Sequence, residues 1–133
     1  MKKTILTLAL VFFVILAVSC EIETNYPAES SGSVFVSNDA ASGKTITRIV
    51  VTTNWGFGDP STKYNNRVSI SPGGKSEKVQ ITIINNDLSY TSRWNYFRVT
   101  VTLNDNSTAS KDIIVYDDIV NNLRYNGTSL VED

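Results

Sequence analysis

The stretch Tyr96-Phe-Arg-Val-Thr-Val-Thr-Leu-Asn-Asp105 decides the fold class of this chain. From Phe97 to Leu103 apolar residues alternate strictly with arginine and threonine. This period of two predicts a β-strand with one buried side and one solvent-facing side. The Asn/Asp-rich run after Leu103 predicts a turn.

The sequence on both sides of this strand has a similar composition. Val, Ile, Thr, Ser and Asn dominate the region, and no segment carries apolar residues at helical spacing. About seven short strands separated by turn-rich loops predict an all-β fold, a single immunoglobulin-like antiparallel β-sandwich. The expected strands are residues 33–37, 44–53, 66–71, 77–84, 97–103 and 111–116, with a final pass through 123–131.

Two local irregularities are expected within this pattern. The apolar alternation of residues 44–53 breaks once, which predicts a β-bulge near Arg48. Residues 117–122 are expected to form a short helical turn.

Composition excludes several classes of function. The chain has 133 residues, with 12 Lys and Arg against 13 Asp and Glu, no histidine and one cysteine. This length suits one small domain, and the slight acidic excess argues against nucleic-acid binding. Without histidine there is no imidazole base near neutral pH. A single cysteine excludes disulfide frameworks and thiolate metal clusters.

The first twenty residues have the three-part layout of a secretory signal peptide. Two lysines precede an apolar run from Ile5 to Val18, and the chain turns polar after Cys20. The apolar run has 14 residues, whereas a helix needs about 20 to cross a bilayer core. We therefore expect residues 1–19 to be a lipoprotein signal peptide that is removed after export.

The only cysteine ends this leader. The sequence Leu16-Ala-Val-Ser-Cys20 resembles a bacterial lipobox, in which small residues precede a cysteine that is lipidated on sulfur and becomes the new amino terminus. The family usually has leucine three residues before the cysteine, where this chain has Ala17. The resemblance implies lipid chains on Cys20, and two or more chains make a firm membrane anchor. An ordinary signal peptide with a cysteine near its end is the alternative.

The mature chain divides into a linker and one domain. Residues 20–32 are expected to be the lipidated amino terminus and a flexible linker, because they are polar, contain one proline and lack sustained periodicity. Residues 33–133 are expected to form the β-sandwich, since about one hundred residues are enough for a two-layer core.

Four segments carry a further resemblance: residues 33–38, 45–52, 70–76 and 96–105. They combine an opening strand that ends in asparagine, a Pro-Gly-Gly turn and a late strand that ends in an Asn/Asp-rich turn. This combination resembles small bacterial envelope lipoproteins with immunoglobulin-like domains. The resemblance implies a fold and no catalytic residue, and the cysteine pair of antibody domains is absent.

No motif predicts catalysis or cofactor binding. The stretch Gly74-Lys-Ser76 has the last residues of a phosphate-binding P-loop, but Ser69 stands where its first glycine should be. No serine lies in a Gly-x-Ser-x-Gly setting. We expect no enzyme activity, no cofactor and no metal. A Ser-Lys pair, paired carboxylates, and calcium in the loops at 85–87 or 104–106 stay open as alternatives.

Aromatic residues concentrate in and beside two loops, and they are the candidate ligand-binding residues. Tryptophan and tyrosine suit such contacts because a flat apolar ring with a polar tip serves a partly wet site. The alternative is that the tryptophans close the ends of the core. The candidates are Trp55, Phe57, Tyr64, Trp94 and Tyr96, with Tyr90 in the same region.

These features predict a membrane-anchored bacterial lipoprotein that acts as a non-catalytic protein-interaction or structural module of the cell envelope. The alternative function is carbohydrate or surface-ligand binding, as in an adhesin, through the aromatic loops. The expected partners are the membrane, through lipid on Cys20, and an envelope protein or glycan. No nucleic-acid partner is expected. The outer membrane or the cell surface is favoured over the inner membrane.

Overall fold

The computed structural model describes residues 29–54, 60–84, 95–115 and 118–133. These residues form eight β-strands in two four-stranded sheets, which confirms the all-β sandwich expected from the sequence. The strands are β1 (Glu29–Asn38), β2 (Ile46–Thr53), β3 (Thr62–Ile70), β4 (Val79–Ile84), β5 (Asn95–Leu103), β6 (Thr108–Val115), β7 (Val120–Tyr125) and β8 (Leu130–Glu132).

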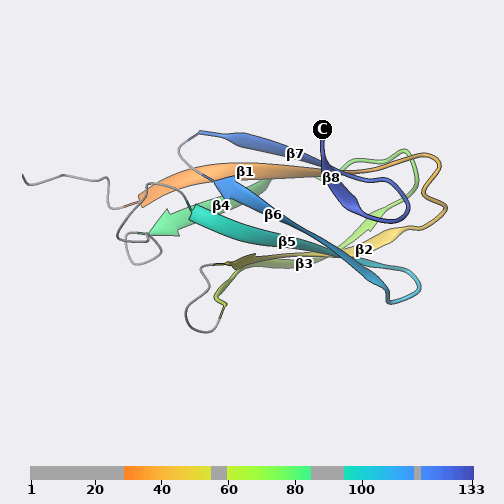
Figure 1. Ribbon diagram of the computed structural model, residues 1–133, viewed down its shortest axis with the longest axis horizontal. Helices are drawn as coiled ribbons and strands as arrows, with labels where there is room; N and C mark the ends of the chain where they lie inside the picture. The colour runs from red at the N-terminus through yellow and green to blue at the C-terminus, as the bar shows by residue number, and fades with distance from the viewer. Residues whose placement is uncertain (1–28, 55–59, 85–94, 116–117) are drawn as a thin grey trace, which may run out of the picture.

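Each sheet combines strands from both halves of the chain. Sheet A has the order β4-β1-β7-β8, and sheet B has the order β3-β2-β5-β6. In Figure 1, β1 and β7 of sheet A lie above β2, β3 and β5 of sheet B. Paired strands in the described part of the chain are antiparallel apart from β1 and β7, which run in parallel. The fully antiparallel arrangement expected from the sequence fails at this pair, because β7 starts at the same end of the sandwich as β1.

The core lies between the sheets and is built from alternate residues of the strands. In β5 the side chains of Phe97, Val99, Val101 and Leu103 are buried, as their alternation predicted. Full burial of such a side chain contributes about 1.5–3 kcal/mol, so this layer is the main source of stability. The other buried apolar residues are Val34, Val36, Ile46, Ile49, Val51, Ile70, Val79, Ile81, Ile113, Val115, Leu123, Tyr125 and Leu130.

β2 carries the irregularity that its sequence predicted. Its register shifts between Ile46 and Arg48 against both neighbouring strands, β3 and β5. The Thr47 hydroxyl at this point donates to the carbonyl of Thr102 at 3.2 Å. The shift allows Ile46 and Ile49, three positions apart, to be fully buried together. The bulge expected near Arg48 is therefore confirmed.

The asparagine that ends β1 meets the Pro-Gly-Gly turn. The Asn38 backbone N–H donates to the carbonyl of Gly74, and its carbonyl accepts from the N–H of Gly73, both at 2.8 Å. Its buried side-chain amide donates to the carbonyls of Lys44 at 2.7 Å and Ile70 at 2.9 Å. Gly73 has φ 81°, which glycine adopts without steric cost. Asn38 thus ties sheet A to the end of β3 and to the loop before β2.

Three boundaries differ from the sequence expectations. β1 begins at Glu29, inside the expected linker, because residues 29–32 pair with 81–84 of β4 and backbone pairing needs no apolar pattern. The final pass consists of two strands, β7 and β8, so there are eight strands in the described residues and not about seven. The helical turn expected at 117–122 is wrong for residues 120–122, which belong to β7 and lie beside residues 33–35 of β1.

The two ends of the sandwich receive different loops. β1, β3, β5 and β7 start at one end, called the Glu29 end here, which lies on the left in Figure 1. The other end, called the Asn38 end, holds the turns at 39–45, 71–78, 104–107 and 126–129. In the described part of the chain there is no helical segment with the length and hydrophobicity that a bilayer crossing requires.

Candidate functional site

The structure places two of the aromatic candidates, Tyr64 on β3 and Tyr96 on β5. The other candidates lie outside the described residues. These are Cys20, Trp55, Phe57 and Trp94, together with Tyr90.

Tyr64 and Tyr96 lie on opposite faces of sheet B. Tyr64 is half-buried and packs against the core. Tyr96 is 47% exposed and precedes the fully buried Phe97, so its ring lies on the outer face. The structure therefore does not bring the two rings together, and of the two Tyr96 is the one available to a ligand.

Tyr96 lines an open pocket of about 450 Å³ where β6 of sheet B approaches β7 and β8 of sheet A. This volume falls within the roughly 300–1,000 Å³ of small-ligand pockets, but the depression is open to solvent and not an enclosed cavity. Tyr96 stands opposite Ile114 in the β5–β6 register. Val120, which is 46% exposed, follows the lining residue Ile119. The lining residues are Tyr96, Asp112, Ile113, Ile114, Ile119, Asn121 and Glu132.

The backbone before β7 is fixed to β1 and so positions one wall of this pocket. The carbonyl of Ile119 accepts from the N–H of Ser33 at 3.0 Å, and the N–H of Asp118 donates to the carbonyl of Ser31 at 2.9 Å. Asp118 has φ 59°, in the left-handed region. This turn directs the chain along β1 and brings Ile119 and Asn121 to the pocket.

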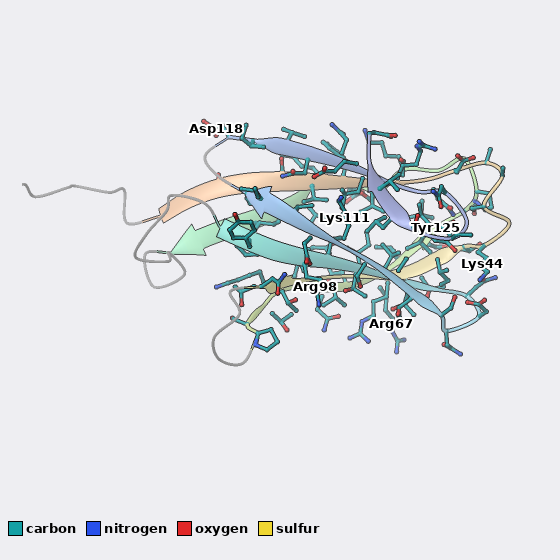
Figure 2. The ribbon with its side chains drawn as sticks, viewed as in Figure 1. Lys44, Arg67, Arg98, Lys111, Asp118 and Tyr125 are labelled. Carbon is teal, nitrogen blue, oxygen red and sulfur yellow. The ribbon has the colours of Figure 1, made fainter. Side chains whose placement is uncertain are left out.

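Asn121 and Glu132 present hydrogen-bond acceptors to the pocket. The Asn121 side-chain amide donates to the carbonyl of Ile114 at 3.2 Å, which leaves its oxygen as the acceptor. The Glu132 carboxylate lies 3.9 Å from the Lys111 ammonium group. Because Lys111 is on β6 and Glu132 on β8, this ion pair joins the two sheets beside the pocket; Figure 2 labels Lys111.

Asp112 is held in its ionised form. Its carboxylate accepts from both Nε and Nη2 of Arg98, at 2.7 and 3.0 Å. These hydrogen bonds lower the pKa of Asp112 below its usual value and raise the pKa of Arg98. The arginine therefore fixes the position of the carboxylate and keeps it charged at neutral pH.

The pocket combines an exposed aromatic ring with oxygen acceptors. Carboxylate and amide oxygens beside an exposed ring suit a ligand rich in hydroxyl donors. The described lining residues include no serine, cysteine, histidine or lysine.

Of the described loop acids, Asp105 was a candidate for calcium, and it is already neutralised by a neighbouring cation. Its carboxylate lies 2.8 Å from the ammonium of Lys44 and accepts from the backbone of Ser107. Lys44 holds the pKa of Asp105 well below its usual value. Within residues 29–54, 60–84, 95–115 and 118–133 no group of three or more His, Cys, Asp or Glu side chains could hold a metal ion.

Sequence reasoning missed the polar half of this pocket. Asp112, Asn121 and Glu132 come from three different strands, and their meeting depends on how the two sheets pack. The residues next to each of them in the sequence do not distinguish it from any other polar residue on a β-strand. The exposed aromatic at Tyr96, outside the buried alternation of β5, was the one signal available.

The chain matches no protein-family model, and neither the curated proteins nor the solved structures show a match. The function of the pocket is therefore inferred from its own geometry.

Proposed function

We propose that this protein is a lipid-anchored bacterial lipoprotein whose immunoglobulin-like sandwich acts as a non-catalytic interaction or structural module of the cell envelope. The leader ending in Cys20 supports the anchor. On this proposal the leader is removed, Cys20 carries the lipid, and the domain faces its partner from the outer membrane or the cell surface. The partner is an envelope protein.

The observation that carries the binding role is the open pocket around Tyr96. Among the described residues, the large hydrophobic side chains that are exposed are those of Tyr96 and Val120. Both belong to or adjoin the pocket between β6 and β7. An exposed ring with charged groups at its border is the arrangement found at the centre of many protein interfaces.

A second function, carbohydrate binding, is supported by the acceptors in the same pocket. Sugars present hydroxyl donors and an apolar face, and the pocket offers the oxygens of Asn121, Glu132 and Asp112 beside the Tyr96 ring. Under this alternative the protein binds an envelope or surface glycan. The two functions use one site and differ in the partner.

Photo-crosslinking from Tyr96 tests both functions in the intact envelope. A photo-crosslinking phenylalanine derivative would replace Tyr96 in the full-length protein, and the matched control would carry it at the exposed residue Ser71 at the Asn38 end. A discrete protein adduct from position 96 alone supports the interaction module. A polydisperse adduct that periodate degrades supports glycan binding. Equal adducts from both positions, or none from position 96, would contradict the proposed site.

Truncation of the ring gives a quantitative prediction. We expect Tyr96→Ala to weaken binding to the partner or glycan captured at this site by about tenfold or more, because tyrosine is the largest side chain that lines the pocket. The side chain lies outside the core, so the melting temperature should change by less than about 4 °C. Calorimetric titration and thermal melting of the purified variant would measure both effects.

A further inference from the structure

The outer face of sheet B carries an uneven set of charges. Alternation from the buried residues places three arginines, Lys63 and one aspartate on this face among the described positions of β2, β3, β5 and β6. Arg98 and Asp112 form the ion pair described above. Arg48 on β2 and Arg67 on β3 are the remaining two arginines.

Arg48 and Arg67 are direct neighbours across the β2–β3 ladder. They stand opposite each other in the register of this antiparallel pair, and both are exposed. Side chains in such positions start about 4.5–5.5 Å apart, and like charges there repel each other. The two guanidinium groups therefore face solvent side by side on an outer surface that contributes nothing to the core.

These two arginines differ from the other arginines in the described chain. Arg98 is paired with one carboxylate, and Arg124 is paired with Asp39 and Asp133. Neither Arg48 nor Arg67 forms an ion pair with any described residue. The whole chain has a formal net charge of −1. The two neighbouring positive charges therefore do not follow from an overall basic composition.

One of the two guanidinium groups is held in place, and the other is free to adapt. The Nε of Arg48 donates to the side-chain oxygen of Asn65 at 2.7 Å, which leaves both of its terminal nitrogens as donors. Figure 2 shows the side chain of Arg67 directed away from the sheet into solvent. In the same cross-strand row, Thr102 on β5 stands beside Arg48. The row thus presents nitrogen donors without a competing carboxylate among the described residues.

We propose that Arg48 and Arg67 form a binding site for an oxyanion, a carboxylate or phosphate group of a ligand or partner. Guanidinium groups bind both kinds of group through paired N–H···O hydrogen bonds. An anion between them would replace the repulsion across the ladder by two attractions. The site lies over β2 and β3 on the outer face of sheet B, whereas the Tyr96 pocket lies beside β6 at the other edge of the sheet, so the site does not depend on the function proposed for that pocket.

Titration with two probes tests this proposal on the full-length protein in an uncharged detergent. Inorganic phosphate and succinate would be added at constant ionic strength while the Nε–H resonances of the arginines are recorded. We expect saturable shifts at Arg48 and Arg67 with a Kd of about 1–10 mM. The probe that binds more tightly identifies the kind of oxyanion that the site prefers.

Three variants separate binding from general charge effects. Arg48→Gln and Arg67→Gln should each weaken binding of the preferred probe at least fivefold, and the control Arg124→Gln, on sheet A, should not. In the absence of the probe, Arg67→Gln should not lower the melting temperature, because it removes a repulsion. Shifts that never saturate, that are equal at Arg124, or that persist in both glutamine variants would overturn the proposal.

Discussion

Replacement of Asn38 by aspartate is expected to lower the free energy of unfolding by about 3–5 kcal/mol at pH 7. The side-chain nitrogen of Asn38 donates to the carbonyls of Lys44 and Ile70. In Asn38→Asp both carbonyls would face a carboxylate oxygen in a site that is 2% exposed. The variant thus loses two hydrogen bonds and gains a buried charge beside two acceptors.

This loss should depend on pH in a defined direction. Burial beside carbonyl oxygens disfavours the charged form, so the introduced carboxyl should have a pKa above its unfolded value of about 4. The unfolded chain then releases its proton before the folded one does as the pH rises. The destabilisation is therefore smallest below about pH 4 and grows as the pH rises to the folded pKa. Urea denaturation at pH 4 and pH 7 would measure the difference.

Asn126 supplies a matched control for this experiment. Its side-chain oxygen accepts from the backbone N–H groups of Thr128 and Ser129, and a carboxylate keeps this role. Asn126→Asp should therefore change stability by less than about 1 kcal/mol. If both variants lost the same free energy of unfolding, or if Asn38→Asp lost none, the role of Asn38 as a donor between the sheets would be wrong.

Replacement of Phe97 by alanine is expected to lower the free energy of unfolding by about 3–5 kcal/mol. Phe97 is fully buried in β5 and stands between Thr53 of β2 and Ile113 of β6. Loss of the ring removes apolar contacts and leaves a cavity that strands held in two ladders cannot fill. The melting temperature should fall by roughly 12 °C or more.

Tyr96→Ala is the natural comparison, because it removes an aromatic ring one residue earlier in the same strand. Tyr96 lies on the outer face and is 47% exposed, so its loss should cost less than about 1 kcal/mol. Thermal melting of the two variants would compare the inner and outer faces of β5 directly. Equal losses would contradict the register of this strand.

The alternation of apolar residues predicted much of sheet B and the all-β class. A strand with one buried face repeats every two residues, and this signal is local, so residues 97–103 and the bulge near Arg48 could be recognised from sequence. The parallel pairing of β1 with β7 could not, because it joins segments more than eighty residues apart. The same distant pairing explains the error at residues 120–122, where a turn-like local sequence forms a strand beside β1.

The candidate site was predictable only in part for a related reason. Tyr96 stood out as an aromatic residue at the edge of a strong strand pattern. Asn121 and Glu132 reach the same pocket because β7 and β8 close over β6, which no local pattern encodes. Asn38 was recognised as the end of a strand, but its hydrogen bonds to Lys44 and Ile70 depend on three loops that meet at one end of the sandwich.

The proposed lipidation of Cys20 can be tested by comparing the native protein with a variant that lacks the cysteine. The full-length protein and its Cys20→Ala variant would be expressed in bacteria fed a fatty-acid analogue, and the intact mass of each purified product would be measured after membrane fractionation. We expect label, loss of the leader and a lipid-sized added mass on the native protein in the membrane fraction, and no label on the variant. A native protein that is unlabelled and recovered in the soluble fraction would contradict the anchor and leave a freely secreted binding domain.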